Sequence, residues 1–180
     1  MLALLALLAG LAVAVFGPTL GRTRVRDSAT RLAALLRAAR AEAATTGRRL
    51  RLSFDEQTHQ PTVSIEPEPL KEPGTFRPYQ AWWVRSARLP EGLSVVSCEL
   101  LGASALTDEQ ILQGGQPAEQ DQPHLAEVTF YPDGGSDSAR ILLAEDTEDQ
   151  PWAAEITLNG VDGTIQVREV DTEEEPIERP

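Results

Sequence analysis

Four aspartates in the second half of the chain, Asp133, Asp137, Asp146 and Asp149, have the residue type that best suits a chemical site. Carboxylate oxygens are the ligands that calcium prefers, so such a group first suggests a Ca²⁺ site. Their spacing does not match a calcium loop such as D-x-[DN]-x-[DN]-G, in which ligands fall at alternate positions. We therefore interpret these aspartates as solvated turn residues and predict no metal.

Few other residues suit metal binding or nucleophilic catalysis. The two histidines, His59 and His124, stand far apart and have no metal-ligand spacing. Cys98 is the single cysteine, so no disulfide can form within the chain. Serine, histidine and aspartate all occur, but no pattern places them together. The sequence predicts a protein that is not an enzyme, with no catalytic residue and no cofactor.

Charge is divided unevenly along the chain. Between Arg22 and Arg51 there are nine arginines and two acidic residues, a balance of +7. From Ser53 to Pro180 there are seven basic and 26 acidic residues, a balance of -19. Contacts with phosphate groups need Lys and Arg side chains gathered on the surface of the folded domain. In this chain the folded body is acidic instead. We therefore expect no nucleic-acid partner.

Residues 1–21 carry no charge and are mostly apolar. A helix of about 20 apolar residues can cross the hydrocarbon core of a bilayer, although Gly17-Pro18 is a weak point near its end. We predict that residues 1–21 are the membrane-spanning half of a helix. The apolar residues expected to pack against lipid or other helices there are Leu4, Leu7, Leu8, Leu11 and Val15.

A secretory signal peptide is the alternative for the same segment. Ala12-Val13-Ala14 has the small residues of a cleavage site, but the basic start of a signal peptide is missing. If the segment is an anchor, Arg22, Arg24 and Arg26 form a basic collar at head-group depth, where anionic lipid attracts basic side chains.

Residues 22–47 continue with a helical pattern. Apolar residues recur at steps of three and four and form one stripe: Ala29, Leu32, Leu36, Ala39 and Ala43. Asp27 or Ser28 can cap a first turn, and Gly47 stands where helices commonly end in a left-handed conformation. Joined to the apolar segment, this pattern predicts one helix of roughly 70 Å, longer than a small domain is wide.

Beyond the helix the period changes to two. In "RRLRLSF", Leu50, Leu52 and Phe54 lie on one face. Further segments have strand composition: Thr62–Glu66, Ala81–Arg85, Leu93–Glu99, Glu127–Tyr131, Ala139–Leu143, Glu155–Asn159 and Thr164–Val170. Turn sequences, "YPDGGSDS" and "NGVDG", separate the last four. We expect an extended loop at Glu66–Tyr79.

The remaining segments are polar. Residues 102–124 are predicted to form a loose loop with a short helical turn around 108–112. The tail, residues 171–180, is acidic and predicted to be disordered, because it holds too little apolar surface to fold.

These elements predict an α+β fold with a β-rich head at residues 48–170. The second half of the long N-terminal helix packs on an antiparallel domain of about seven or eight strands. The residues expected to meet are Leu32, Leu35, Leu36 and Ala39 of the helix and Leu50, Leu52, Val128, Phe130, Ile156 and Leu158 of the strands.

Three stretches resemble a known family. "LAALLRAARAEAATTGRRLRLSFD", with Ala39, Arg40, Ala43 and Gly47, is similar to the junction of helix and first strand in the minor pseudopilins called GspH and their type IV pilus relatives, FimT. "VTFYPDGGSDSARILL" resembles the family's later turn and strand, with matching residues Phe130, Pro132, Asp133 and Gly134. "AAEITLNGVDGTIQV" resembles the family's closing hairpin, in which a Gly precedes the last apolar strand. The resemblance covers roughly residues 1–170 and implies a pilin-like fold.

The resemblance also implies a function. Such a protein is a structural subunit of a periplasmic type II secretion pseudopilus, held in the inner membrane by one helix, with its β domain in the periplasm. Its partners are other pseudopilins or pilins, membrane lipid and an exported protein substrate. Family members carry a basic leader, Gly and a Phe-Thr-Leu-Ile-Glu-like start. A peptidase cleaves after the Gly and methylates the new N-terminus. We expect that motif immediately before Met1.

Other functions remain open beside this one. A FimT-like minor type IV pilin would have the same fold, and some such pilins bind DNA. A secreted or membrane-anchored β domain that binds a ligand without catalysis would explain the acidic body but not Arg40. Basic residues that follow an apolar run usually stay cytoplasmic. The family's leader would override that signal and place the β domain in the periplasm.

Overall fold

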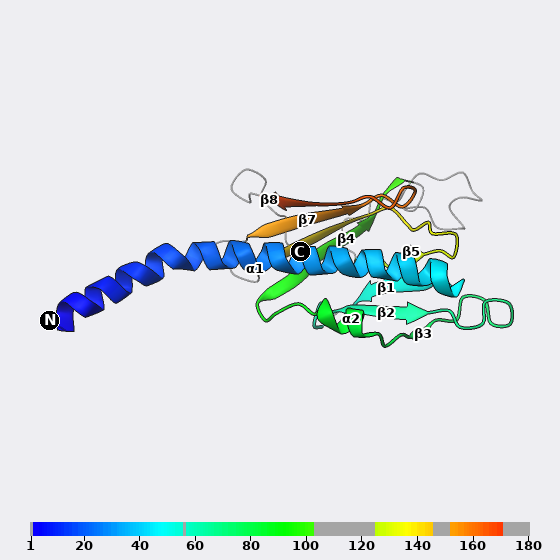
Figure 1. The fold of residues 1–180 in the computed structure, drawn as a ribbon, viewed down its shortest axis with the longest axis horizontal. Helices are drawn as coiled ribbons and strands as arrows, with labels where there is room; N and C mark the ends of the chain where they lie inside the picture. The colour runs from blue at the N-terminus through cyan, green and yellow to red at the C-terminus, as the bar shows by residue number, and fades with distance from the viewer. Residues whose placement is uncertain (1, 56, 103–124, 146–151, 171–180) are drawn as a thin grey trace.

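The computed structural model describes residues 2–55, 57–102, 125–145 and 152–170, with side chains from residue 21 onward. One long helix lies along two antiparallel sheets and extends beyond them at its N-terminal end (Figure 1). The elements are α1 (Leu2–Thr46), β1 (Leu50–Phe54), β2 (Pro61–Ile65), β3 (Arg77–Pro78), α2 (Trp82–Ser86), β4 (Leu93–Leu100), β5 (Val128–Phe130), β6 (Ala139–Glu145), β7 (Ala153–Leu158) and β8 (Ile165–Val170). This is the predicted α+β fold, and its strand count agrees with the expected seven or eight.

Helix α1 runs unbroken for 45 residues. It passes through Gly17-Pro18, and Asp27 and Ser28 lie inside it, so the prediction that one of them caps a turn is wrong. Ser28 is 3% exposed, because the apolar pattern on both sides continues one helix face and leaves no reason for a break. The helix ends as predicted at Gly47, where φ is +65° and the backbone N–H donates to the Ala43 carbonyl at 3.0 Å.

Each sheet has four strands and is antiparallel throughout. The first has the order β3-β2-β1-β5 and the second β4-β6-β7-β8. In the first sheet Leu52 pairs with Val63 on one side and Val128 on the other. In the second, Ile156 of β7 lies between Ile141 of β6 and Val167 of β8.

The core forms where α1 covers both sheets. The helix contacts β1 and β5 of the first sheet and β6, β7 and β8 of the second. The ten side chains predicted to meet are each at most 1% exposed and belong to one cluster: Leu32, Leu35, Leu36, Ala39, Leu50, Leu52, Val128, Phe130, Ile156 and Leu158. That part of the fold prediction is confirmed.

One predicted strand, Ala81–Arg85, is wrong. The segment forms the short helix α2, in which the Val84 N–H donates to the Ala81 carbonyl at 3.2 Å. Trp83 and Val84 pack against the core from this turn, so tertiary packing overrides the strand propensity of these residue types.

The predicted loop at Glu66–Tyr79 contains more structure than expected. Its backbone turns back on itself where the Glu72 N–H donates to the Glu68 carbonyl at 2.8 Å, and it also supplies β3. The predicted turn around 108–112 and the acidic tail at 171–180 lie outside the described residues.

Candidate functional site

Arg40 of α1 reaches across to two turns of the head. Its Nε donates to the carbonyl of Gly134, in the connection from β5 to β6. Its Nη1 donates to the carbonyl of Asp162, in the connection from β7 to β8, at 3.0 Å. A planar guanidinium presents several donors in fixed directions, which suits two carbonyls from separate loops. Arg40 therefore fixes the helix to both sheets.

Aspartates shape the two turns that Arg40 contacts. Asp133 Oδ1 accepts from the Gly135 N–H at 2.8 Å, and Asp162 Oδ1 accepts from the Thr164 N–H at 2.7 Å. The hydrogen bonds from Thr164 lower the pKa of Asp162. Asp137 accepts from the Thr129 N–H at 2.8 Å. These carboxylates thus serve local turns, as expected for Asp133 and Asp137.

Gly163 permits the close approach of Arg40. Its φ is +73°, and a Cβ added there would lie 0.9 Å from Arg40 Nη1. Any side chain at residue 163 would therefore displace the guanidinium. The sequence did not indicate that Asp162 and Gly163 contact Arg40, because "NGVDG" predicts only a turn within a closing hairpin. Its two glycines were the available signal that a close contact occurs there.

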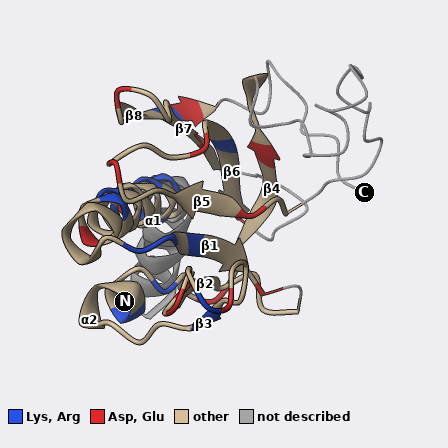
Figure 2. Cartoon of the chain, turned by 90° about the vertical axis from the view of Figure 1, so that its right-hand side faces the viewer, with Lys and Arg blue, Asp and Glu red and all other residues tan. Residues whose placement is uncertain are grey.

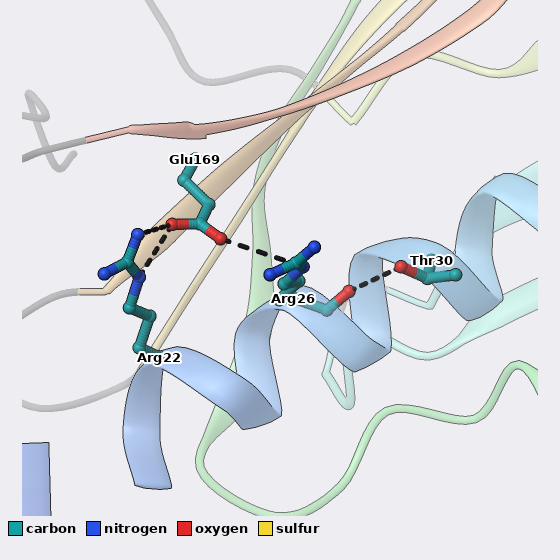
Figure 3. Close-up of polar contacts among 4 residues, drawn as sticks. All are labelled: Arg22, Arg26, Thr30 and Glu169. Carbon is teal, nitrogen blue, oxygen red and sulfur yellow. Dashed lines mark hydrogen bonds and ion pairs between the residues drawn. The ribbon is translucent and has the colours of Figure 1, made fainter. Parts of the chain in front are cut away.

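The basic collar lies where α1 leaves the head. Arg22 Nε donates to Glu169 Oε2 of β8 at 2.7 Å, and Arg26 Nε lies 3.9 Å from Glu169 Oε1 (Figure 3). Arg24 donates to the carbonyl of Glu91 at 3.0 Å. The collar therefore contacts the head on two sides, and Glu169 is a partner that the sequence did not indicate.

An ion pair between a partly exposed arginine and a buried carboxylate anchors the loop after β2. Arg49 donates to both carboxylate oxygens of Glu66, at 2.5 and 2.6 Å, and the Gly74 N–H donates to Glu66 Oε1 at 2.5 Å. Glu66 is fully buried. Its hydrogen bonds with Arg49 lower the pKa of Glu66 despite its burial, and they raise the pKa of Arg49. The hydrogen bond from Gly74 to Glu66 joins the two ends of the loop that carries Leu70, which is 98% exposed, and the pair with Arg49 ties this loop to the start of β1.

The residues that could bind a metal or act in catalysis lie apart in the described structure. Within residues 2–55, 57–102, 125–145 and 152–170, no three His, Cys, Asp or Glu side chains gather as they would around a metal ion. Cys98 is buried, and burial raises the pKa of its thiol to about 12. His59 Nδ1 lies 2.9 Å from the Val95 carbonyl. Asp146, Asp149 and His124 lie outside the described residues.

The other predicted site residues divide into two groups. Ala39, Ala43 and Phe130 are fully buried, so their role in the junction is packing. Leu4, Leu7, Leu8, Leu11 and Val15 belong to the helical backbone of α1, but their side chains lie outside the described part of the structure. Among the residues that the structure describes, no helix has the length and apolar character needed to cross a membrane.

The fold and the Arg40 junction define the class of protein: a pilin-like subunit with one extended N-terminal helix packed on a two-sheet head. Within that class, the chain belongs to the GspH family. The family model "Type II transport protein GspH" matches residues 28–162, which include α1 from Ser28 onward and the Arg40 junction. No curated protein matches the chain. Membership of this family supports the prediction that the protein has a structural rather than an enzymatic role.

Solved structures share this fold. The minor pseudopilin EpsH from the type 2 secretion system of Vibrio cholerae is 19% identical, with a TM-score of 0.51, over 80% of this chain and 94% of that one. GspH of E. coli is also 19% identical, with a TM-score of 0.51, over 87% and 94% of the two chains. The type IV minor pilin FimU of Pseudomonas aeruginosa is 15% identical, with a TM-score of 0.46, a likeness too weak to bear on function.

Proposed function

We propose that this protein is a structural minor pseudopilin, a subunit of a type II secretion pseudopilus that supports protein export. The N-terminal half of α1 would anchor it in the inner membrane, with the head in the periplasm. Its partners would be other pseudopilins, which pack helix against helix.

The extension of α1 beyond its own head carries this proposal (Figure 1). Among the residues whose side chains the structure describes, the buried apolar stripe of α1 runs from Val25 to Ala43, in the second half of the helix. Residues 2–20 form about 28 Å of further helix at 1.5 Å per residue, close to the thickness of a bilayer's hydrocarbon core. We infer that this uncharged half meets lipid or other helices.

Small residues in this half suit close helix packing. Ala3, Ala6, Ala9, Gly10, Ala12 and Ala14 are spread along it. In hydrocarbon, small side chains let helices approach closely and gain van der Waals contact. The collar then marks the membrane surface, and each of its arginines can gain about 1 kcal/mol from anionic lipid.

Deletion of the gene from its own locus, followed by complementation, tests the proposal. The native gene should restore export of a type II substrate, and the protein should sediment with membranes. A Leu8→Arg variant should lose both, because a charge at the centre of a spanning helix is costly. The matched control Gln166→Arg, on the exposed strand β8, should behave like the native protein.

Two results would contradict the proposal. The first is unchanged export in the deletion strain combined with lost pili, which would favour the minor type IV pilin. The second is a native protein that is recovered free of membranes after N-terminal cleavage at Ala14. That result would favour a secreted β domain that binds a ligand.

A further inference from the structure

The short helix α2 presents a tryptophan and an arginine to solvent. Trp82 is 76% exposed. Arg85, three residues later and therefore on the same side of the helix, is also exposed and forms no ion pair among the described residues. Arg88, just beyond the end of the helix, is likewise exposed without such a partner. In Figure 2, α2 carries a basic segment and no acidic one. We call Trp82, Arg85 and Arg88 the α2 surface.

The other side of α2 is held against the core. Trp83 and Val84 pack against the buried cluster. The ring centroid of Tyr79 lies 6.1 Å from that of Trp83, and the Tyr79 hydroxyl donates to Glu42 Oε1 of α1 at 2.5 Å. Because these contacts fix how the short helix is rotated about its axis, Trp82 cannot turn inward. The fold therefore holds this indole in solvent.

The charge around the α2 surface differs from that of the rest of the head. Residues 73–90 contain three arginines and no acidic residue. From Ser53 to Pro180 there are only seven basic residues against 26 acidic ones, so this short segment holds three of the seven. Arg77 lies 3.2 Å from Glu72. The other two arginines, those of the α2 surface, are the ones that can meet an external anion.

The α2 surface continues into the basic collar. Arg24 of the collar donates to the Glu91 carbonyl at 3.0 Å, and Glu91 follows Arg88 by three residues, which span at most about 11 Å. Helix α2 also contacts α1 itself. In Figure 1 the N-terminal end of α1 curves toward the side of the head that carries α2. If that end spans the bilayer, as proposed above, the α2 side of the head is turned toward the membrane.

An exposed indole beside unpaired arginines fits an anionic membrane surface. Tryptophan is enriched at membrane–water interfaces, because its ring is apolar and its N–H can stay hydrated. Anionic head groups attract arginines that lie close to the surface. We propose that the α2 surface contacts the anionic face of the membrane, with Trp82 in the interface and Arg85 and Arg88 among the head groups.

This contact gives the head a second attachment beside the collar and fixes its tilt on the bilayer. The orientation of the head rests on the proposed function, because it needs the anchor in α1. The affinity of the α2 surface for anionic lipid does not rest on it, since that affinity comes from the three exposed side chains themselves.

Fluorescence quenching in the full chain, reconstituted into vesicles, tests the contact. Ser86→Cys carries a nitrobenzoxadiazole label on the exposed side of α2, and Cys98 stays unlabelled because it is buried and its pKa is raised to about 12. Val161→Cys, 90% exposed in the turn between β7 and β8, is the matched control. That turn lies beside Arg40, about 24 Å along α1 from the middle of the collar.

The quencher is a trace lipid with a nitroxide on its head group. The label at position 86 should be quenched in vesicles of equal parts phosphatidylcholine and phosphatidylglycerol, and much less in phosphatidylcholine alone. The label at position 161 should stay unquenched in both. Raising the salt from about 0.01 M to about 1 M shortens the screening length from about 30 Å to about 3 Å, and it should release the label at position 86.

Variants of the surface make the test specific. Arg85→Gln combined with Arg88→Gln should lower the ratio of quenched to unquenched label at position 86 about 25-fold, since each basic residue near an anionic surface contributes about fivefold. Trp82→Ala should also lower this ratio. Arg140→Gln combined with Arg168→Gln removes the same charge from the second sheet, where these side chains are 50% and 65% exposed, and should leave the ratio unchanged.

Four results would overturn the proposal. Three concern lipid: no quenching at position 86 in anionic vesicles, equal quenching in neutral and anionic vesicles, and quenching that survives the double arginine variant. The fourth is a label at position 86 that responds to added protein and not to lipid, which would assign the surface to a protein partner. Sedimentation with neutral vesicles tests the anchor separately. A chain that failed to sediment would contradict the pseudopilin proposal, and quenching in anionic vesicles would still decide the α2 surface.

Discussion

Single arginines make the connections on which this fold depends. Arg40 joins α1 to the carbonyls of Gly134 and Asp162, and Arg49 joins the start of β1 to the buried carboxylate of Glu66. Both use more than one guanidinium nitrogen. Lysine has the charge but not this fork of donors, so the geometry rather than the charge is what these two positions require.

Replacing Arg40 with lysine tests the junction. Arg40→Lys should lower the free energy of unfolding by about 1–2 kcal/mol, because one ammonium cannot satisfy both carbonyls and leaves a charged hydrogen bond unmade. Arg37→Lys, on the exposed side of the same helix, should change it by less than about 0.5 kcal/mol. Urea unfolding of the full chain in detergent measures both. Equal effects of the two substitutions would contradict the role of Arg40.

The Glu66 pair predicts a pH dependence. Its folded-state pKa is lowered, so the stability it contributes is fully present above the unfolded-state pKa of about 4.3. That stability is lost as pH falls through the lower folded-state value. Glu66→Gln should cost about 1–3 kcal/mol at pH 7 and should flatten the loss of stability in acid. Denaturant titrations at a series of pH values check this, and a variant whose acid dependence matches the native protein would refute it.

Among the elements of the fold that the structure describes, α1 is the one helix surface on which both sheets pack. Its stripe from Val25 to Ala43 covers strands of both, and Arg40 contacts a turn from each side of the junction. Strands β5 and β6 are consecutive but belong to different sheets, and the turn that Arg40 binds connects them. Helix packing and sheet assembly are therefore coupled.

A cavity in the interface between α1 and the sheets should destabilise the whole head. Leu36 is fully buried, so Leu36→Ala should cost about 2–5 kcal/mol. The same substitution at Leu70, which is 98% exposed, should cost less than about 0.5 kcal/mol. Tryptophan fluorescence reports on α2 and on Trp152 near β7. If the two sheets unfolded in separate transitions in Leu36→Ala, the coupling through α1 would be wrong.

The elements whose apolar residues recur at regular spacing could be predicted from the sequence. The apolar stripe of α1, the strands around it and the helix end at Gly47 all follow from local periodicity and turn chemistry. Contacts between distant residues were not predictable in this way. Glu169 with Arg22, Tyr79 with Glu42 and Gly163 with Arg40 depend on sheet register and on the crossing of α1. The strand prediction at Ala81–Arg85 was wrong for a related reason, since Trp83 packs against the core from a helical turn.

At the scale of the whole molecule, the collar separates the proposed membrane-spanning half of α1 from the head, and it marks the proposed membrane surface. Replacing Arg22, Arg24 and Arg26 with glutamine should weaken binding to vesicles that contain anionic lipid. The head at residues 48–170 should stay folded, because exposed pairs such as Arg22–Glu169 contribute no more than about 1 kcal/mol. Vesicle sedimentation and circular dichroism measure the two effects. Unfolding of the head would show that the collar is structural.

Cross-linking within the membrane tests the central claim most directly. Single cysteines at Ala9 and Ala12 of α1, introduced at the native locus, would be paired with cysteines in the apolar helices of the other pseudopilins. Cys98 is buried with a raised pKa, so it does not interfere. Gln57→Cys, exposed on the head, is the control. We predict disulfide-linked heterodimers from the helix positions and none from Gln57. If Ala9→Cys and Ala12→Cys gave no adduct while export continued, the proposed packing of α1 among pseudopilin helices would be wrong.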